Sequence, residues 1–274
     1  MGKALVIKGL EVLNPIAHVS IVGASPSVLT TYYKRNTSIT DAQRESLNTL
    51  VKTLRTEGLW DKLYYFYPFL GNTIEDMTLE CTDTENEDLF ALSGTSGLTV
   101  DKNFLIIDST RSKGIIYPTS ATLISPSNVS FIMASANPYI SSPTFMDANN
   151  GNKRINLVAY SAGGAPMTMS CGIDESNATS KITGVKLGST ILERVVCGTI
   201  NNGNGVIWND KTKYAEGTGN TDFTIGRVST IFTRSGEVDG KLAFFAMAQY
   251  MTEAEWGKFY DALLVFLKAT GKHS

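Results

Sequence analysis

Few residues in this sequence could catalyse a reaction. His18 and His273 are its two histidines, so a Ser-His-Asp triad or a histidine metal centre would have to use one of them. No GxSxG elbow, no GxGxxG after a strand and no Walker loop is present. Glycoside hydrolysis needs two neighbouring carboxylates, but Asp101 and Asp108 are an odd number of residues apart, on opposite faces of a regular strand. We therefore predict a protein that is not an enzyme, with glycan hydrolase as a less favoured alternative.

Metal ligands are equally sparse. Acidic residues gather once, at Asp83, Glu85, Glu87 and Asp88. Their carboxylates could bind calcium, but an EF-hand needs glycine in place of Asp88 and an acidic residue in place of Gly94. A solvated loop is the prediction, and neither a metal nor another cofactor is expected.

The cysteines are Cys81, Cys171 and Cys197. Their number is odd and no CxxC pair occurs, so neither a disulfide framework nor a zinc site is indicated. We expect three buried thiols in a reducing compartment.

Composition excludes some partners. The chain has 274 residues, of which 18% are charged, and a net charge of −2. No basic run favours nucleic acid or an anionic membrane. No stretch approaches the ~20 apolar residues of a membrane span, and no signal-peptide pattern is found. The sequence therefore predicts a soluble protein that binds neither nucleic acid nor membrane.

Two helices are well marked. The first is predicted at residues 40–57, where Thr40 and Gln43 fit a capping box and Gly58 a stop signal. The second is predicted at residues 252–270, with a capping box at Thr252 and Glu255 and Gly271 past its end. Both have an apolar stripe at helical spacing. The stripes consist of Leu47, Leu50, Val51 and Leu54, and of Trp256, Phe259, Leu263, Phe266 and Leu267.

Between the helices the sequence is of β type. An aromatic-rich tail over residues 59–70 is expected to be buried under the first helix. Short strands separated by turn signals follow, and Asn202-Gly203 is the strongest hairpin signal. This pattern favours a two-sheet sandwich or jelly roll. The expected strands are 78–81, 104–108, 114–117, 130–136, 155–160, 167–173, 181–187, 189–200, 203–209, 212–216, 222–226 and 242–249.

The second half has a familiar order of segments. It contains INLVAYSAGGAPMTMSCGIDES, VVCGTINNGNGVIWNDKTKYAEGTG, FTIGR and KLAFFAMAQYMTEAEWGKFYDALLVFLKATG. With its Asn-Gly hairpin, and a late strand that runs into an acidic helix start, this half resembles the concanavalin A-like (LamG-like) jelly roll over residues 75–274. The resemblance implies a mainly β fold, a jelly-roll sandwich with two flanking α-helices.

Together with DAQRESLNTLVKTLRTEGLWDKLYYFYPFLG, the pattern looks like structural proteins of tailed bacteriophages, including gut Bacteroidetes (crAss-like) phages. In such proteins this helix precedes the jelly roll, and the module is repeated around the virion as a head fibre, capsid decoration or tail component. The resemblance implies a virion location after synthesis in the host bacterial cytoplasm, with other virion proteins as partners. No functional residue is carried over from it.

The chain divides into three predicted parts, namely an N-terminal arm (1–35), a capped helix with its aromatic tail (36–71) and the jelly roll (72–274). The arm, with an extended piece at 29–33, is too short for a core of its own. We expect it to add a strand to a neighbour's sheet in a homo-dimer or homo-trimer, and so to attach the protein. The predicted contacts are Ala4, Leu5, Val6, Ile7, Leu10, Val12 and Leu13, and further contacts at residues 18–22 are left open.

Two main functions remain open. The first is a non-enzymatic virion component attached through the arm. The alternative is a carbohydrate-binding module that recognises a bacterial surface glycan. Trp208 and Tyr214, near the Asn-Gly hairpin, would then stack on sugar rings, although they could equally belong to the sandwich core.

Overall fold

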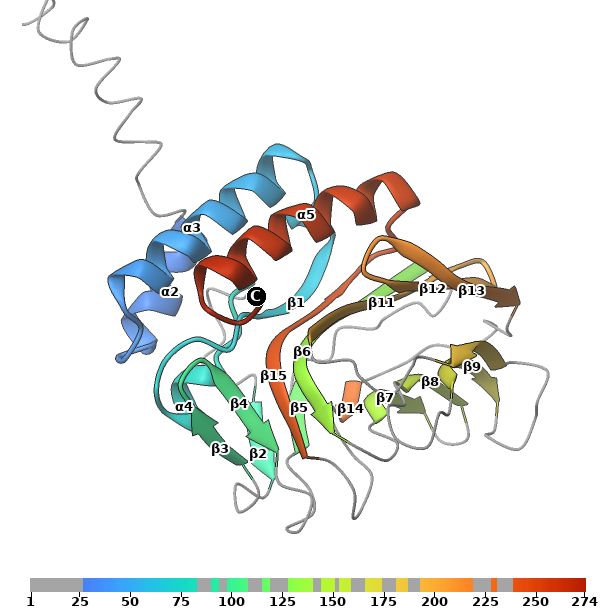
Figure 1. Ribbon diagram of the computed structural model, residues 1–274, viewed down its shortest axis with the longest axis horizontal. Coiled ribbons are helices and arrows are strands. Elements are labelled where there is room, and N and C mark those ends of the chain that lie inside the picture. The colour runs from blue at the N-terminus through green and yellow to red at the C-terminus, as the bar shows by residue number, and fades with distance from the viewer. Residues whose placement is uncertain are drawn as a thin grey trace, which may run out of the picture.

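The structure is a computed structural model, in which helices lie on one side of a curved β-sheet (Figure 1). The helices are α2 (Ser27–Arg35), α3 (Asp41–Thr56), α4 (Ile74–Met77), α5 (Glu253–Ala269) and the 3₁₀ turn η1 (Trp60–Lys62). The structure describes residues 27–82, 90–93, 98–107, 115–118, 128–139, 144–150, 153–158, 166–173, 181–186, 193–218, 228–230 and 239–274.

The described strands form antiparallel ladders. They are β1 (Leu63–Tyr67), β2 (Phe90–Ser93), β3 (Leu98–Asp101), β4 (Phe104–Ile107), β5 (Ile115–Pro118), β6 (Asn128–Tyr139), β7 (Thr144–Asn150), β8 (Lys153–Val158), β9 (Pro166–Ile173), β10 (Lys181–Lys186), β11 (Glu193–Asn201), β12 (Asn204–Asn209), β13 (Thr212–Thr218), β14 (Val228–Thr230) and β15 (Asp239–Ala248).

These strands make two main sheets. An eight-stranded sheet has the order β13-β12-β11-β6-β15-β4-β3, with β1 also paired to β15. A five-stranded sheet has the order β10-β9-β8-β7-β14, and β2 pairs with β5. Figure 1 shows the five-stranded sheet on the side of the large sheet away from α3 and α5. The predicted mainly β sandwich with flanking helices is thereby confirmed.

Helix α3 begins and ends where its sequence predicts. The Thr40 hydroxyl accepts a hydrogen bond from the backbone N–H of Gln43, whose side chain accepts one from the backbone N–H of Thr40. Gly58 follows the helix with a φ of +67°, a left-handed conformation that glycine adopts without a Cβ penalty. The predicted apolar stripe of this helix is buried.

Helix α5 is capped in the same way by Thr252 and Glu255. Its apolar face packs on the outer side of the large sheet, where the ring centroids of Phe244 and Phe259 are 6.2 Å apart. Trp256 is 1% exposed and donates its indole N–H to the backbone carbonyl of Asp210 at 2.9 Å. Burial of large aromatic side chains, worth roughly 1.5–3 kcal/mol each, therefore holds this helix to the sheet.

The aromatic tail after α3 is buried, as predicted, and part of it is a strand that the sequence did not reveal. Strand β1 pairs with β15, with Phe66 opposite Ala246. The Phe66 ring contacts Phe244 at 5.0 Å and Trp60 at 5.3 Å between centroids. The tail thus joins α3 to the middle of the large sheet.

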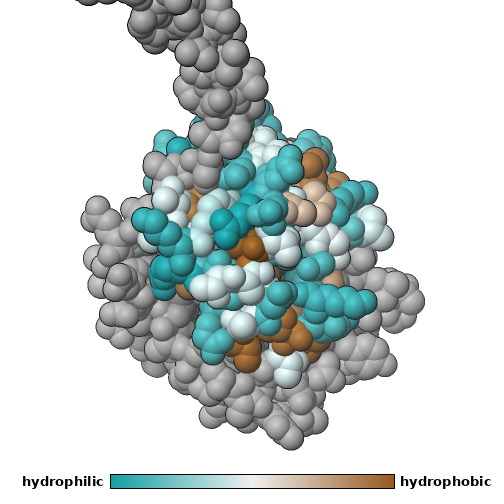
Figure 2. All heavy atoms as spheres, turned by 90° about the vertical axis from the view of Figure 1, so that its left-hand side faces the viewer, coloured by the Kyte–Doolittle hydropathy of each residue, from teal (hydrophilic) through white to brown (hydrophobic). Residues whose placement is uncertain are grey.

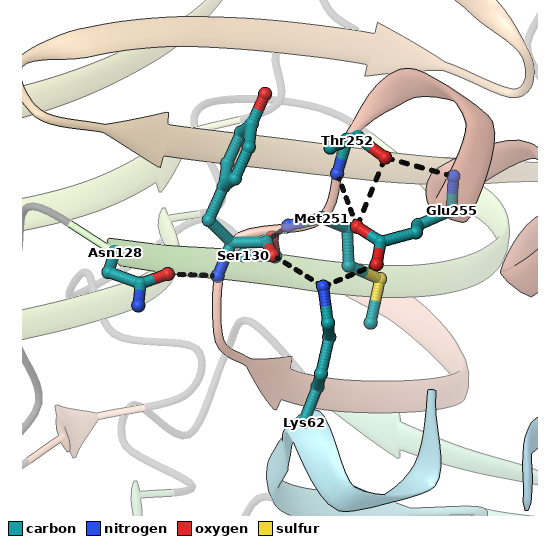
Figure 3. A network of polar contacts seen from close by, with 7 residues as sticks. Lys62, Asn128, Ser130, Met251, Thr252 and Glu255 are labelled. Carbon is teal, nitrogen blue, oxygen red and sulfur yellow. Dashed lines mark hydrogen bonds and ion pairs between the residues drawn. The ribbon is translucent and has the colours of Figure 1, made fainter. Parts of the chain in front are cut away.

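A polar network fastens the start of α5 to the rest of the fold (Figure 3). Lys62 Nζ lies 2.5 Å from Glu255 Oε1 and donates to the Tyr250 carbonyl at 3.3 Å. The Tyr250 N–H donates to the Asn128 side chain at 2.7 Å. Burial raises the pKa of Glu255, but hydrogen bonds from Lys62 and Thr252 outweigh it, so the pKa lies below its ordinary value.

Two local predictions are wrong. Residues 29–33, expected to be extended, belong to helix α2, where Leu29 and Tyr32 are buried three residues apart. Burial of this helical face outweighs the strand preference of the β-branched and aromatic residues around it. The predicted strand at 78–81 is instead a turn after α4, where the buried Glu80 carboxylate accepts the backbone N–H of Phe66 at 2.8 Å.

The predicted Asn-Gly hairpin is confirmed. It joins β11 to β12, with φ of +47° at Asn202 and +82° at Gly203, as a type I′ turn requires. Of the other expected strands, 222–226 lies outside the described residues, and the remaining ones overlap strands of the structure.

Candidate functional site

The five-stranded sheet has two unlike faces. In an antiparallel ladder, residues directly opposite one another share a face, and alternate residues along a strand occupy opposite faces. The backbone register therefore assigns residues to faces across β7, β8, β9 and β10.

One register row is polar on all four strands. Asp147 of β7 is opposite Asn156 of β8, which is opposite Ser170 of β9, which is opposite Lys181 of β10. Adjoining positions of the same face extend it. We call this the polar face, and it consists of Asp147, Asn149, Arg154, Asn156, Thr168, Ser170, Lys181 and Thr183, with Val158 and Gly172 among them.

The opposite face carries apolar residues in its central rows. One row is Met146, Leu157, Met169 and Ile182, and the next is Ala148, Ile155 and Cys171. This alternation is typical of a sheet with one face on a core and the other toward water. The polar face is accordingly the side of this sheet that is suited to a dissolved ligand.

The polar row offers several kinds of hydrogen-bonding group. A carboxylate accepts, an ammonium donates, and the amide and the hydroxyl do both. With neighbouring strands about 4.8 Å apart, the row from Asp147 to Lys181 covers roughly 14 Å of backbone. Such a length and mixture match a ligand with many hydroxyl groups, such as a short oligosaccharide.

The outer side of the large sheet is closed to a ligand by α3 and α5. Leu50 of α3, Phe266 of α5 and Phe244 of β15 are each at most 1% exposed and belong to one apolar cluster. A molecule could reach the sheet there only by displacing these helices, so we place no ligand on this side.

The two predicted sugar-stacking residues do not make a platform. Trp208 of β12 is 3% exposed and belongs to the apolar cluster beneath the helices, as the core interpretation anticipated. Tyr214 is half-buried on β13, at an irregularity in its pairing with β12. Trp208 therefore offers no ring face to a ligand in this structure.

Other candidate residues are distributed as follows. Asp101 forms an ion pair with Lys241 at 3.1 Å, and His273 is half-buried. Asp108, His18, the acidic cluster at 83–88 and the predicted arm contacts Ala4–Leu13 lie outside the described residues. Within the described residues, no three His, Cys, Asp or Glu side chains gather in a way that could hold a metal.

Cys81 and Cys197 are buried free thiols, as predicted. Burial raises the pKa of both thiols well above the ordinary value and so favours the protonated thiol over the nucleophilic thiolate at neutral pH. The side chain of Cys171 is not among those described.

The polar face was not recognised in the sequence. Strands β8 and β9 were expected, but β7 was not, and its Asp147 and Asn149 lie in a stretch that resembles a loop. Their alternation with Met146 and Ala148 was the signal that could have revealed it.

Comparison with known proteins supports the fold. The sialidase of Trypanosoma rangeli in complex with sialic acid has a TM-score of 0.51 and 10% identity, over 80% of this chain and 39% of the sialidase. The binding domain of botulinum neurotoxin DC in complex with SialylT has a TM-score of 0.55 and 11% identity, over 74% of this chain and 52% of that one. The chain thus matches only about half, or less, of these structures. At such low identity the likeness concerns the β-sandwich fold.

No protein-family model matches the sequence, and no curated protein is significantly similar to it. Among the described helices, none is long and apolar enough to cross a membrane.

Proposed function

We propose that this chain is a non-catalytic glycan-binding module and that the glycan binds to the polar face. The observation that carries the proposal is the row of Asp147, Asn156, Ser170 and Lys181 on four adjacent strands. Sugar hydroxyls both donate and accept hydrogen bonds, and this row supplies both kinds of partner.

Two further observations support this assignment. The outer side of the other sheet is occupied by α3 and α5, which leaves the five-stranded sheet as the broad sheet surface for recognition. The named ligands of similarly folded proteins, sialic acid and SialylT, make glycans the first ligand class to test.

A second part of the proposal concerns the larger assembly to which the module belongs. We infer from the sequence resemblance that the protein is a structural component of a bacteriophage virion, as a head fibre, capsid decoration or tail component. A glycan on the host surface is then the natural target. A homo-oligomer remains part of this proposal, since repetition around a virion axis would supply identical neighbours.

Binding is tested with immobilised bacterial capsular and O-antigen polysaccharides and with sialylated oligosaccharides. The full chain should bind at least one of these classes. Asn156→Ala and Lys181→Ala should each weaken that binding about tenfold, equivalent to ~1.4 kcal/mol. Lys213→Ala is the matched control, because Lys213 is an exposed strand lysine of the other sheet.

Each result has a clear meaning. An unchanged affinity in both polar-face variants, with normal melting, would place the site elsewhere. Failure to bind any glycan would overturn the proposed function. Release of reducing ends from a bound polysaccharide would show that the protein is an enzyme. The virion assignment is tested separately by mass spectrometry of purified particles, where absence of the chain refutes it.

A further inference from the structure

An open groove runs between α3 and α5 on their outer side. Its volume is about 560 Å³. The groove is independent of the polar face, because it lies on the other side of the large sheet. It is lined by Ala42, Glu45, Ser46, Thr49, Leu50 and Thr53 of α3 and by Asp261, Ala262, Val265, Phe266 and Ala269 of α5.

The groove is more apolar than its residue types suggest. The hydroxyls of Ser46, Thr49 and Thr53 each donate to the backbone carbonyl four residues earlier, at 2.8–2.9 Å. An apolar occupant would therefore leave none of these donors unsatisfied. Val265, whose surface is 60% exposed, adds a large apolar side chain. An apolar segment could therefore cover the groove without breaking the hydrogen bonds of these three hydroxyls.

The dimensions fit a short segment of polypeptide. The lining residues of α3 run from Ala42 to Thr53, about 16 Å along the helix, and those of α5 from Asp261 to Ala269, about 12 Å. Two to three helical turns, or four to five extended residues, have this length.

The chain itself contains a segment of matching chemistry. Residues 4–13 read ALVIKGLEVL, with Lys8 and Glu11 inside the segment and Lys3 directly before it. The groove has acidic side chains on both walls, Glu45 on α3 and Asp261 on α5, of which Asp261 forms an ion pair with Lys211 at 2.6 Å. A mainly apolar segment that carries lysines complements an apolar groove with Glu45 on its wall.

The connection is long enough. Helix α2, where the described chain begins, lies beside α3, and the Tyr33 hydroxyl donates to the Arg44 carbonyl at 3.1 Å. Arg44 lies on a different side of α3 from the groove residues Ala42 and Ser46, so the connection must cross α3. Residues 14–26 can extend over roughly 45 Å, whereas a helix is only about 10 Å across.

We propose that the groove between α3 and α5 binds residues 4–13 of the same chain. Their apolar side chains cover Ala42, Val265 and Ala269, the exposed apolar residues of the groove, and a lysine lies toward Glu45. In this proposal the arm binds its own chain, whereas the sequence prediction has it extend a neighbour's sheet.

The test is photo-crosslinking in the full-length chain. A benzoylphenylalanine is placed at position 265, in the groove, and as a matched control at position 254, which is exposed on α5 but does not line the groove. Irradiation and peptide mass spectrometry should join position 265 to residues 4–13, and position 254 should give no such link. A mixture of ¹⁴N- and ¹⁵N-labelled protein distinguishes links within one chain from links between two.

A second variant keeps the result decisive. The double substitution Val6→Asp and Leu10→Asp should abolish the link from position 265, whereas Ser20→Asp, in the connecting stretch, should preserve it. Links between differently labelled chains would identify a second copy as the occupant and overturn the proposal. A link from position 265 to another region, or none to residues 4–13, would also overturn it.

Discussion

The side-chain nitrogen of Lys272 lies 2.6 Å from the backbone carbonyl oxygen of Phe69, inside the protein. It also donates to the carbonyls of Pro68 and Ala243, at 2.7 and 2.9 Å. Lys272 is 2% exposed, and burial lowers the pKa of its ammonium well below the ordinary value. Three carbonyls match the three N–H groups of an ammonium, so one side chain ties the end of α5 to the segment after β1 and to β15.

Replacing Lys272 by Met should therefore destabilise the protein. The substitution keeps most of the side-chain volume but leaves three carbonyls without their donor, at an expected loss of roughly 2–4 kcal/mol in the free energy of unfolding. Urea unfolding monitored by tryptophan fluorescence measures it. The matched control is Lys268→Met at an exposed position, which should change stability by less than about 0.5 kcal/mol. Equal stability of the two variants would refute the role given to Lys272.

Lys272 also predicts a pH dependence. Because its pKa is lower in the folded than in the unfolded state, the unfolded chain binds the proton more strongly between the two values. The free energy of unfolding should therefore rise as the pH increases from the lowered pKa toward 10.5. Below this pH range Lys272 is protonated in both states, and the folded state bears the full cost of the buried charge. The measurement is the stability of the wild type minus that of Lys272→Met, at pH values from 7 to 10.5. A constant difference would contradict the lowered pKa.

Two glycines with positive φ should respond differently to alanine. At Gly71 (φ +110°) a Cβ would lie 2.6 Å from the Cβ of Asp76, so the buried chain must shift. At Gly58 (φ +67°) a Cβ would meet nothing within 4 Å. We expect Gly58→Ala to cost about 1 kcal/mol from backbone strain alone and Gly71→Ala roughly 3–5 kcal/mol. Thermal melting followed by circular dichroism compares them, and similar losses would show that the contact at Gly71 relaxes easily.

The buried tryptophans differ in their polar atoms. Trp256 donates its indole N–H to the Asp210 carbonyl, whereas the indole N–H of Trp208 finds no hydrogen-bond partner among the described residues. Trp256→Phe should therefore cost at least about 1 kcal/mol more than Trp208→Phe, since only the former breaks a hydrogen bond. Trp256→Ala should cost roughly 3–5 kcal/mol. Chemical unfolding tests the order, and a larger loss for Trp208→Phe would reverse the assignment.

The parts predicted from the sequence are those fixed by local signals. Capping pairs such as Thr40 with Gln43 locate a helix end within a few residues, and Asn202-Gly203 specifies its turn through the positive φ of both residues. Helix α2 could not be predicted in this way. The fold, and not local preference, buries its Leu29 and Tyr32.

The residues of the candidate site are brought together by strand pairing. Asp147 and Lys181 are 34 residues apart, and nothing in the sequence says that they occupy one row. Only the register through Asn156 and Ser170 brings them onto one face. Residue type alone suggested Trp208 as a sugar-stacking residue, because aromatic rings can stack on sugars, but this side chain is buried in the apolar cluster under the helices.

The position of β15 has a consequence for synthesis. This strand is the last of the described strands in sequence order, yet it lies between β6 on one side and β4 and β1 on the other, and no other described strand joins these two parts of the large sheet. A nascent chain that has not yet released residues 239–248 from the ribosome can pair β11 with β12 and β3 with β4, but β1 and β4 lack the edge of β15 that they join in the complete sheet. The large sheet should therefore close only after residues 239–248 have left the ribosome, and ribosome-bound fragments that stop before residue 239 should keep the β15-facing edges of β1 and β4 accessible to chaperones.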